Sequence, residues 1–65
     1  MFRINDVVQI DPASDEKFGG CFMIITEVKT WGAKGYITVP GFTGLAYYNC
    51  NNKNMIFIGV AAWST

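Results

Sequence analysis

The stretch CFMIITEVKTWGAKGYITVP, residues 21–40, decides the fold. Its first part, residues 21–28, is rich in β-branched and aromatic side chains and predicts the strongest strand of the chain. Alternation places Met23 and Ile25 on one face, and Val28 joins them if the strand kinks. Apolar residues that recur at every second position indicate a strand with one buried side.

The second half of the stretch predicts a partner strand. KTWGAKG, residues 29–35, contains two glycines and predicts a hairpin tip. YITVP, residues 36–40, predicts a strand with Ile37 and Val39 pointing inward. Pro40 cannot donate to a ladder and ends it. The stretch therefore predicts a β-hairpin.

Further strand-like segments lie on both sides of this hairpin. Strands are predicted over residues 5–11, 45–50 and 55–60. The connections are a polar loop that ends at Gly19-Gly20, a short turn at 41–44 and a polar turn at 51–54. The last of these turns is either a tight turn or one turn of 3₁₀ helix. In the first strand, Val8 and Ile10 alternate around Gln9. No segment keeps a helical period. Five short strands predict an all-β fold, and 65 residues are too few for a sandwich. We expect one domain, residues 1–65, folded as a small, partly open barrel of about five antiparallel strands.

The opening strand, the glycine pair and the tight meander resemble the SH3-like small barrels of the KOW and Tudor type. In that family the first strand opens with a G-D-x-V pattern, which Asp6-Val7-Val8 matches, while Asn5 stands where the pattern has glycine. The resemblance covers residues 2–60 and implies an SH3-like barrel. The chain is also similar in texture to short proteins encoded by bacteriophages and prophages, a likeness that carries no activity.

The composition predicts contact with another protein. Apolar residues make up 51% of the chain and aromatic residues 15%. The interior of a small barrel holds on the order of a dozen side chains, so some apolar side chains must lie on the surface. Contiguous apolar surface usually marks a partner. We expect a protein partner or self-association, with a homodimer as one form; apolar residues scattered singly are the alternative.

The net charge is zero, but the charge is unevenly spread. Residues 1–27 hold two basic and five acidic residues, and residues 28–65 hold three lysines and no acid. The balance argues against a non-specific duplex-DNA binder, which needs several cations against phosphates. Cys21 and Cys50 form no C-x-x-C motif and are expected as free thiols. No signal segment or membrane span is recognised, so a cytoplasmic location is expected, in the host cell if the chain is phage-encoded.

The residue inventory excludes most catalytic chemistry. The chain has no histidine, the commonest general base and metal ligand. Asp11, Asp15 and Glu16 lack the spacing of a calcium loop, and a solvated acidic loop is the better interpretation. The glycines do not form a phosphate-binding motif. We expect no enzyme activity, no metal and no cofactor.

Two groups of residues remain as candidates for partner binding. The first is the hairpin tip, where Trp31 offers a stacking face between Lys29 and Lys34. The alternative is that Trp31 folds back and caps the open end of the barrel. The second group is aromatic and contains Tyr36, Phe42, Tyr47 and Tyr48.

Adjacent strand residues point to opposite faces, so only one residue of the Tyr47-Tyr48 pair can share the outer face with Tyr36. Such a face could contact protein or single-stranded bases, or simply stabilise the sheet. The tail holds Trp63, which we expect to dock on the barrel or on a second copy.

Two functions follow as hypotheses. The first is a non-catalytic protein-interaction module, such as a phage accessory protein that binds a host or virion protein. The second is a small barrel that binds single-stranded RNA or DNA, which the KOW-like outline and the basic second half favour.

Overall fold

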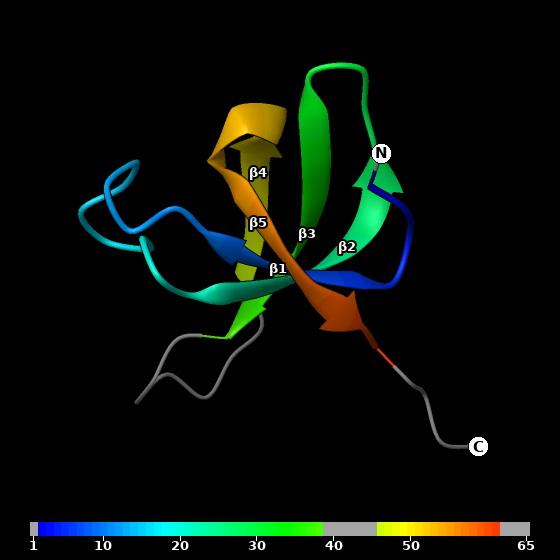
Figure 1. Cartoon of the computed structure of the whole chain (residues 1–65), viewed down its shortest axis with the longest axis horizontal. Helices are drawn as coiled ribbons and strands as arrows, with labels where there is room; N and C mark the ends of the chain where they lie inside the picture. Colours follow the sequence, from blue (N-terminus) through cyan, green and yellow to red (C-terminus); the bar gives the residue numbers. More distant parts are fainter. Residues whose placement is uncertain (1, 39–45, 62–65) are drawn as a thin grey trace.

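A computed structural model describes residues 2–38 and 46–61 of the chain. It contains five strands and one short 3₁₀ helix, which are β1 (Asp6–Ile10), β2 (Phe22–Val28), β3 (Gly32–Thr38), β4 (Ala46–Asn51), η1 (Asn52–Asn54) and β5 (Met55–Val60). All pairings are antiparallel and form one sheet in the order β4-β3-β2-β1-β5. Figure 1 shows the sheet curling so that β5 crosses in front of the other strands. The predicted all-β class and the five antiparallel strands are confirmed, and the fold is small and barrel-like.

The topology mixes the acidic and basic halves of the sequence. Strands β1 to β4 follow one another as a meander, whereas β5 returns to pair with β1. The loop between β1 and β2 projects to the left of the sheet in Figure 1. As a result, segments from both halves lie side by side, and the uneven charge of the sequence does not become one positive side.

The core forms from the alternating residues of the strands, as expected. Eight hydrophobic residues are buried among those that the structure describes: Val8, Ile10, Met23, Ile25, Ala33, Ile37, Cys50 and Met55. The inward positions predicted for β1 and β2 are confirmed, as is Ile37. Val39, Pro40, Phe42 and Trp63 lie outside the described residues.

A bulge in β2 explains the position of Val28. The register shifts between Ile25 and Glu27, so that Ile25 pairs with Gly35 and Val28 with Ala33. Since paired residues share a face, the bulge returns Val28 to the core side. Val28 is nevertheless 42% exposed, because it lies at the open end of the barrel.

The hairpin tip is shorter than the sequence predicts. Lys29 and Gly32 exchange backbone hydrogen bonds of 2.8 and 3.3 Å, so only Thr30 and Trp31 lie between them. The two glycines predicted for the tip lie in β3. A β-carbon on Gly35 would collide with the backbone carbonyl oxygen of Ile24, so glycine is needed here for close strand packing rather than for a turn.

Candidate functional site

Tyr36 and Tyr47 lie on the outer face of the sheet, near its β4 edge. They are direct cross-strand partners on β3 and β4. The Tyr47 hydroxyl donates a 2.6 Å hydrogen bond to the Tyr36 hydroxyl, and the ring centroids are 4.5 Å apart. The prediction that Tyr36 shares its face with one member of the Tyr47-Tyr48 pair is confirmed, and that member is Tyr47.

Lys34 supplies the positive charge of this face. It lies two residues before Tyr36 on β3, and its Nζ is 5.5 Å from the centroid of the Tyr47 ring, a cation–π distance. The hydrogen bond to Tyr36 is the main cause that raises the pKa of Tyr47. Tyr47 is therefore neutral at physiological pH, and Lys34 decides the charge that a partner would meet.

A strip of apolar side chains continues from the tyrosines across the sheet. The register links Tyr47, Tyr36, Ile24 and Val7 as successive neighbours on β4, β3, β2 and β1. We call these four residues the outer strip. The sequence reasoning missed Ile24 and Val7, although each lies at the outward position of its predicted strand.

Tyr48 lies on the opposite face, apart from the outer strip. It pairs with Gly35 and packs against the core. Its hydroxyl donates a 2.8 Å hydrogen bond to Asp15 Oδ2, and its ring meets Phe18 edge-on with centroids 5.6 Å apart. Tyr48 therefore holds the β1–β2 loop against the barrel, while the other tyrosines face outward.

Trp31 is exposed at the hairpin tip. Its side chain is 47% exposed, so it does not plug the barrel end as a buried residue would. The tip is fixed to η1, because Asn52 donates from its backbone to the Trp31 carbonyl at 3.0 Å and from its side chain to the Thr30 carbonyl at 3.2 Å. Trp31 thus sits on a turn with a defined position.

A shallow pocket of about 340 Å³ lies beside Trp31. Its lining residues are Phe2, Val28, Lys29, Thr30 and Asn52. Lys29 also forms an exposed 3.4 Å ion pair with Glu27, which contributes little stability. The volume is at the lower end of the range of ligand pockets, about 300–1,000 Å³. No sequence signal pointed to Phe2, which comes from the far end of the chain.

The described residues contain no metal or nucleophile cluster. No group of three or more His, Cys, Asp or Glu side chains gathers in residues 2–38 and 46–61. Both cysteines are free thiols, as predicted, and burial raises the pKa of the Cys50 thiol. In the loop, Asp11 Oδ1 accepts from Ala13 N and Asp15 Oδ1 accepts from Lys17 N and Phe18 N. These carboxylates organise the turns of the loop.

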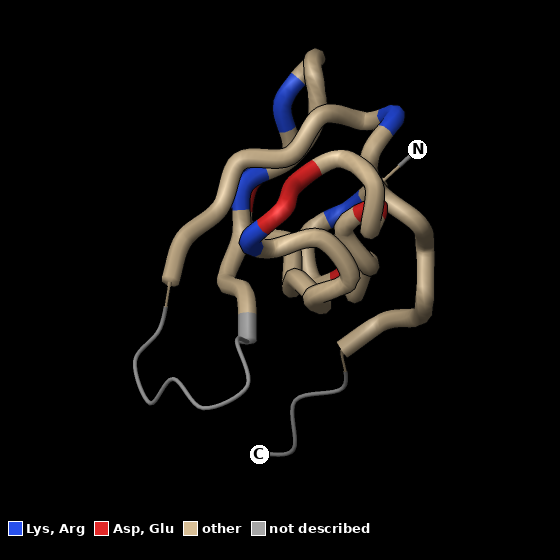
Figure 2. Tube along the Cα trace, turned by 90° about the vertical axis from the view of Figure 1, so that its left-hand side faces the viewer, with Lys and Arg blue, Asp and Glu red and all other residues tan. Residues whose placement is uncertain are grey.

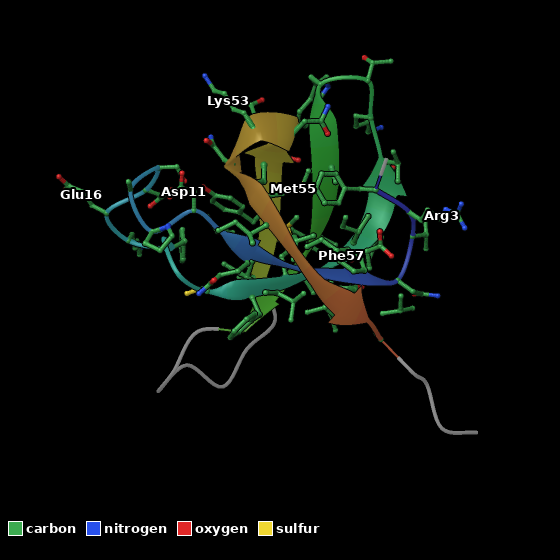
Figure 3. The ribbon with its side chains drawn as sticks, in the orientation of Figure 1. Arg3, Asp11, Glu16, Lys53, Met55 and Phe57 are labelled. Atoms are coloured by element: carbon green, nitrogen blue, oxygen red, sulfur yellow. The ribbon has the colours of Figure 1, made fainter. Side chains whose placement is uncertain are left out.

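Charged side chains are distributed over the molecule. Figure 2 shows acidic and basic positions interspersed along the trace. In Figure 3, Arg3, Glu16 and Lys53 extend outward from three different sides. Across the part of the chain that is described, no helix is long and apolar enough to cross a membrane.

Comparison of the chain with protein-family models, curated proteins and solved structures gives no match.

Proposed function

We propose that the chain is a non-catalytic protein-interaction module that contacts its partner through the hairpin tip and the outer strip. One observation carries this proposal. Among residues 2–38 and 46–61, nine large apolar side chains are 42–67% exposed: Ile4, Phe22, Val28, Trp31, Tyr47, Ile56, Phe57, Ile58 and Val60. Three of the nine lie on the proposed surfaces: Val28 and Trp31 at the hairpin tip and Tyr47 on the outer strip. Exposed apolar side chains that gather in one patch are typical of contact sites.

The chemistry of the two surfaces supports a protein ligand. Trp and Tyr are typical of interface centres, where a large ring is buried, and a neighbouring lysine suits the hydrated polar rim. The pocket at the tip is lined by the apolar side chains of Phe2 and Val28 together with the polar residues Lys29, Thr30 and Asn52.

We further propose that the barrel is of the SH3-like type and that the chain is a phage or prophage accessory protein acting in the host cytoplasm. Asn5 supports the first part, because its φ of 76° lies in the left-handed region that favours glycine. Asn5 is the residue that stands where the SH3-like pattern has glycine. The likeness to short phage proteins favours a host or virion protein as the partner.

A second candidate function is binding of single-stranded nucleic acid. The observation that favours it is Lys34 above the ring of Tyr47, next to Tyr36, because bases stack on aromatic rings while lysine contacts phosphate. The interspersed acidic residues weaken this candidate, since the phosphate contribution grows with the number of clustered cations.

A pull-down from native bacterial lysate, with and without nuclease, tests both functions. The bait proteins are the tagged wild type, Trp31→Ala, Tyr47→Ala and, as the matched control, Ile4→Ala, which removes an apolar side chain that is 59% exposed outside both surfaces. The protein-interaction proposal expects a nuclease-resistant partner that Trp31→Ala and Tyr47→Ala lose and Ile4→Ala keeps. A captured partner that disappears after nuclease treatment favours nucleic-acid binding instead. A partner retained by both tip and strip variants, or no partner at all, contradicts the proposed surfaces.

A further inference from the structure

Strand β5 is an edge strand that exposes apolar side chains on both of its faces. It stands at the end of the strand order and pairs with β1 alone among the described elements. Ile56 is 47% exposed, Phe57 56%, Ile58 51% and Val60 67%. Neighbouring strand residues point to opposite faces, so neither side of β5 is fully covered. Figure 3 shows Met55 and Phe57 along this strand.

The strand carries little of the protection that edge strands usually have. Natural edges are blunted by charged residues, by proline or by bulges. Residues 55–60, MIFIGV, contain no charge and no proline. One bulge is present, because Val8 pairs with Phe57 and Val7 with Gly59, which leaves Ile58 as the extra residue. The bulge interrupts the second half of β5 and leaves residues 55–57 regular.

Two hydrogen bonds fix which backbone groups of β5 face away from β1. Asp11 N donates to Asn54 O at 2.8 Å and Ala61 N donates to Asn5 O at 2.7 Å, so Asn54 and Ala61 turn their backbone groups toward the β1 side. Backbone groups alternate along an antiparallel strand. The backbone groups of Met55 and of Phe57 therefore point outward, with Ile56 between them. The Met55 N–H already donates to Asn52 O at the end of η1, so Met55 offers its C=O, and Phe57 offers its N–H, to a further strand.

We propose that β5 pairs antiparallel with β5 of a second copy of this chain, about a two-fold axis at Ile56. The Phe57 N–H of each copy donates to the Met55 C=O of the other, which gives two hydrogen bonds related by the axis. Ile56 then faces its own counterpart as a non-hydrogen-bonded pair, with β-carbons about 4.5–5.5 Å apart. The second copy also covers Phe57, which pairs with the buried Val8 but is itself more than half exposed.

The second copy is the occupant that the charge and symmetry of β5 favour. An uncharged strand meets no like charge when it pairs with itself, and it offers a foreign charged segment no counter-charge. A two-fold interface must be self-complementary, and residues 55–57 satisfy this because the axis at Ile56 brings the Phe57 N–H of each copy to the Met55 C=O of the other. A contact of three residues on each copy buries less surface than a standard interface of roughly 1,200–2,000 Å². The proposed dimer is therefore weak, with a dissociation constant on the order of 10 µM to 1 mM.

The inference does not rest on the proposed function, because Ile56 lies outside the hairpin tip and the outer strip. The test uses opposite charges at the axis. Ile56→Lys and Ile56→Glu each place like charges against each other in a self-pair, whereas a mixture of the two variants places Lys opposite Glu. The matched controls are Ile4→Lys and Ile4→Glu at an exposed isoleucine away from β5. Sedimentation velocity from about 1 µM to about 1 mM measures the mass, and circular dichroism checks that each variant is folded.

The expected wild-type mass rises with concentration from 7.2 kDa toward twice that value. Each Ile56 variant alone stays at one chain, their mixture returns to a dimer of one chain of each kind, and the Ile4 variants behave as the wild type. A wild type that stays at one chain up to about 1 mM overturns the proposal, and this result does not depend on the variants folding. Dimers of either Ile56 variant as stable as the wild type, a folded mixture that fails to pair, or assembly beyond two copies also overturn it. Loss of the lysate partner leaves this result unaffected, so the two proposals fail separately.

Discussion

The Tyr48 hydroxyl donates a 2.8 Å hydrogen bond to Asp15 Oδ2 across 33 positions of sequence. This bond joins β4 to the long β1–β2 loop. The same carboxylate accepts two backbone hydrogen bonds through Oδ1, from Lys17 and Phe18. Asp15 therefore both shapes the turn of the loop and connects it to the barrel.

Tyr48→Phe should loosen the loop without unfolding the barrel. Phenylalanine keeps the ring contact with Phe18 but loses the hydroxyl that reaches Asp15. We expect tryptic cleavage after the exposed Lys17 to become severalfold faster, measured by mass spectrometry under native conditions. Tyr47→Phe is the matched control, since it loses an exposed tyrosine hydrogen bond that does not involve the loop. Equal rates of cleavage in the two variants would contradict the role of the Tyr48–Asp15 hydrogen bond in holding the loop.

Protonation of Asp15 in the β1–β2 loop should make the protein less stable in acid. Hydrogen bonds from the Phe18 backbone, the Tyr48 hydroxyl and the Lys17 backbone lower the pKa of Asp15. A lowered folded-state pKa contributes stability that is fully present above the unfolded value of about 3.9 and is lost as pH falls through the folded value. Melting temperatures from about pH 6 to pH 2 should fall less steeply for Asp15→Asn than for wild type. Parallel curves would show that Asp15 does not contribute.

At alkaline pH the hydroxyl of Tyr48 should have the opposite effect, so that stability falls as pH rises. Burial, followed by the bond to Asp15, raises the pKa of Tyr48 to about 12. A raised folded-state pKa contributes stability that is complete below the unfolded value of about 10 and is lost between that value and 12. Spectrophotometric titration at 295 nm should show, in the wild type, a tyrosine that ionises at high pH and that Tyr48→Phe lacks. An unchanged titration midpoint in that variant would rule this out.

Glycine at position 35 should be essential for the sheet. A β-carbon there would collide with the Ile24 carbonyl oxygen, which belongs to the backbone of the paired strand and cannot move aside alone. We expect Gly35→Ala to destabilise the protein by roughly 3 kcal/mol or more. Gly59→Ala is the control, because its β-carbon meets nothing within 4 Å, and it should change stability by less than about 1 kcal/mol. Urea denaturation of both variants measures the difference, and equal losses would contradict the argument.

Asn5 should tolerate glycine better than any β-branched residue. Its φ is 76°, a conformation that costs an ordinary residue about 1–2 kcal/mol and glycine almost nothing. Asn5→Gly should therefore keep nearly the wild-type stability, whereas Asn5→Val should lose on the order of 2 kcal/mol. Thermal melts of the two variants check this. An Asn5→Val protein as stable as Asn5→Gly would mean that the turn relaxes.

Strands β1, β2 and β3 could be predicted because one side of each is buried. Val8 and Ile10, Met23 and Ile25, and Ile37 are inward residues at the period of two that a half-covered sheet imposes. Gly32 and Gly35 misled the prediction of the hairpin tip, because glycine serves close backbone approach as well as turns and sequence does not separate the two uses.

The candidate site could be predicted only in part. Alternation separates Tyr47 from Tyr48 but does not say which one faces outward, and the direction of Trp31 on a turn follows no period. The pocket joins Phe2 to Val28 and Asn52, which are remote in sequence, so they come together only in the folded, curled sheet. The exposure of β5 was missed because MIFIGV has the composition of a buried strand.

The pairing of β1 with both β2 and β5 has a consequence for biosynthesis. Residues 22–51 form a meander of neighbouring hairpins that can assemble while the chain is still being made. Val7 meets its partner Gly59 only after β5 has been synthesised. Until then the edge of β1 that faces β5 is unpaired, and its pairing is a long-range step that is expected to be slow. A nascent chain stalled before residue 55 therefore lacks the strand that pairs with the second edge of β1.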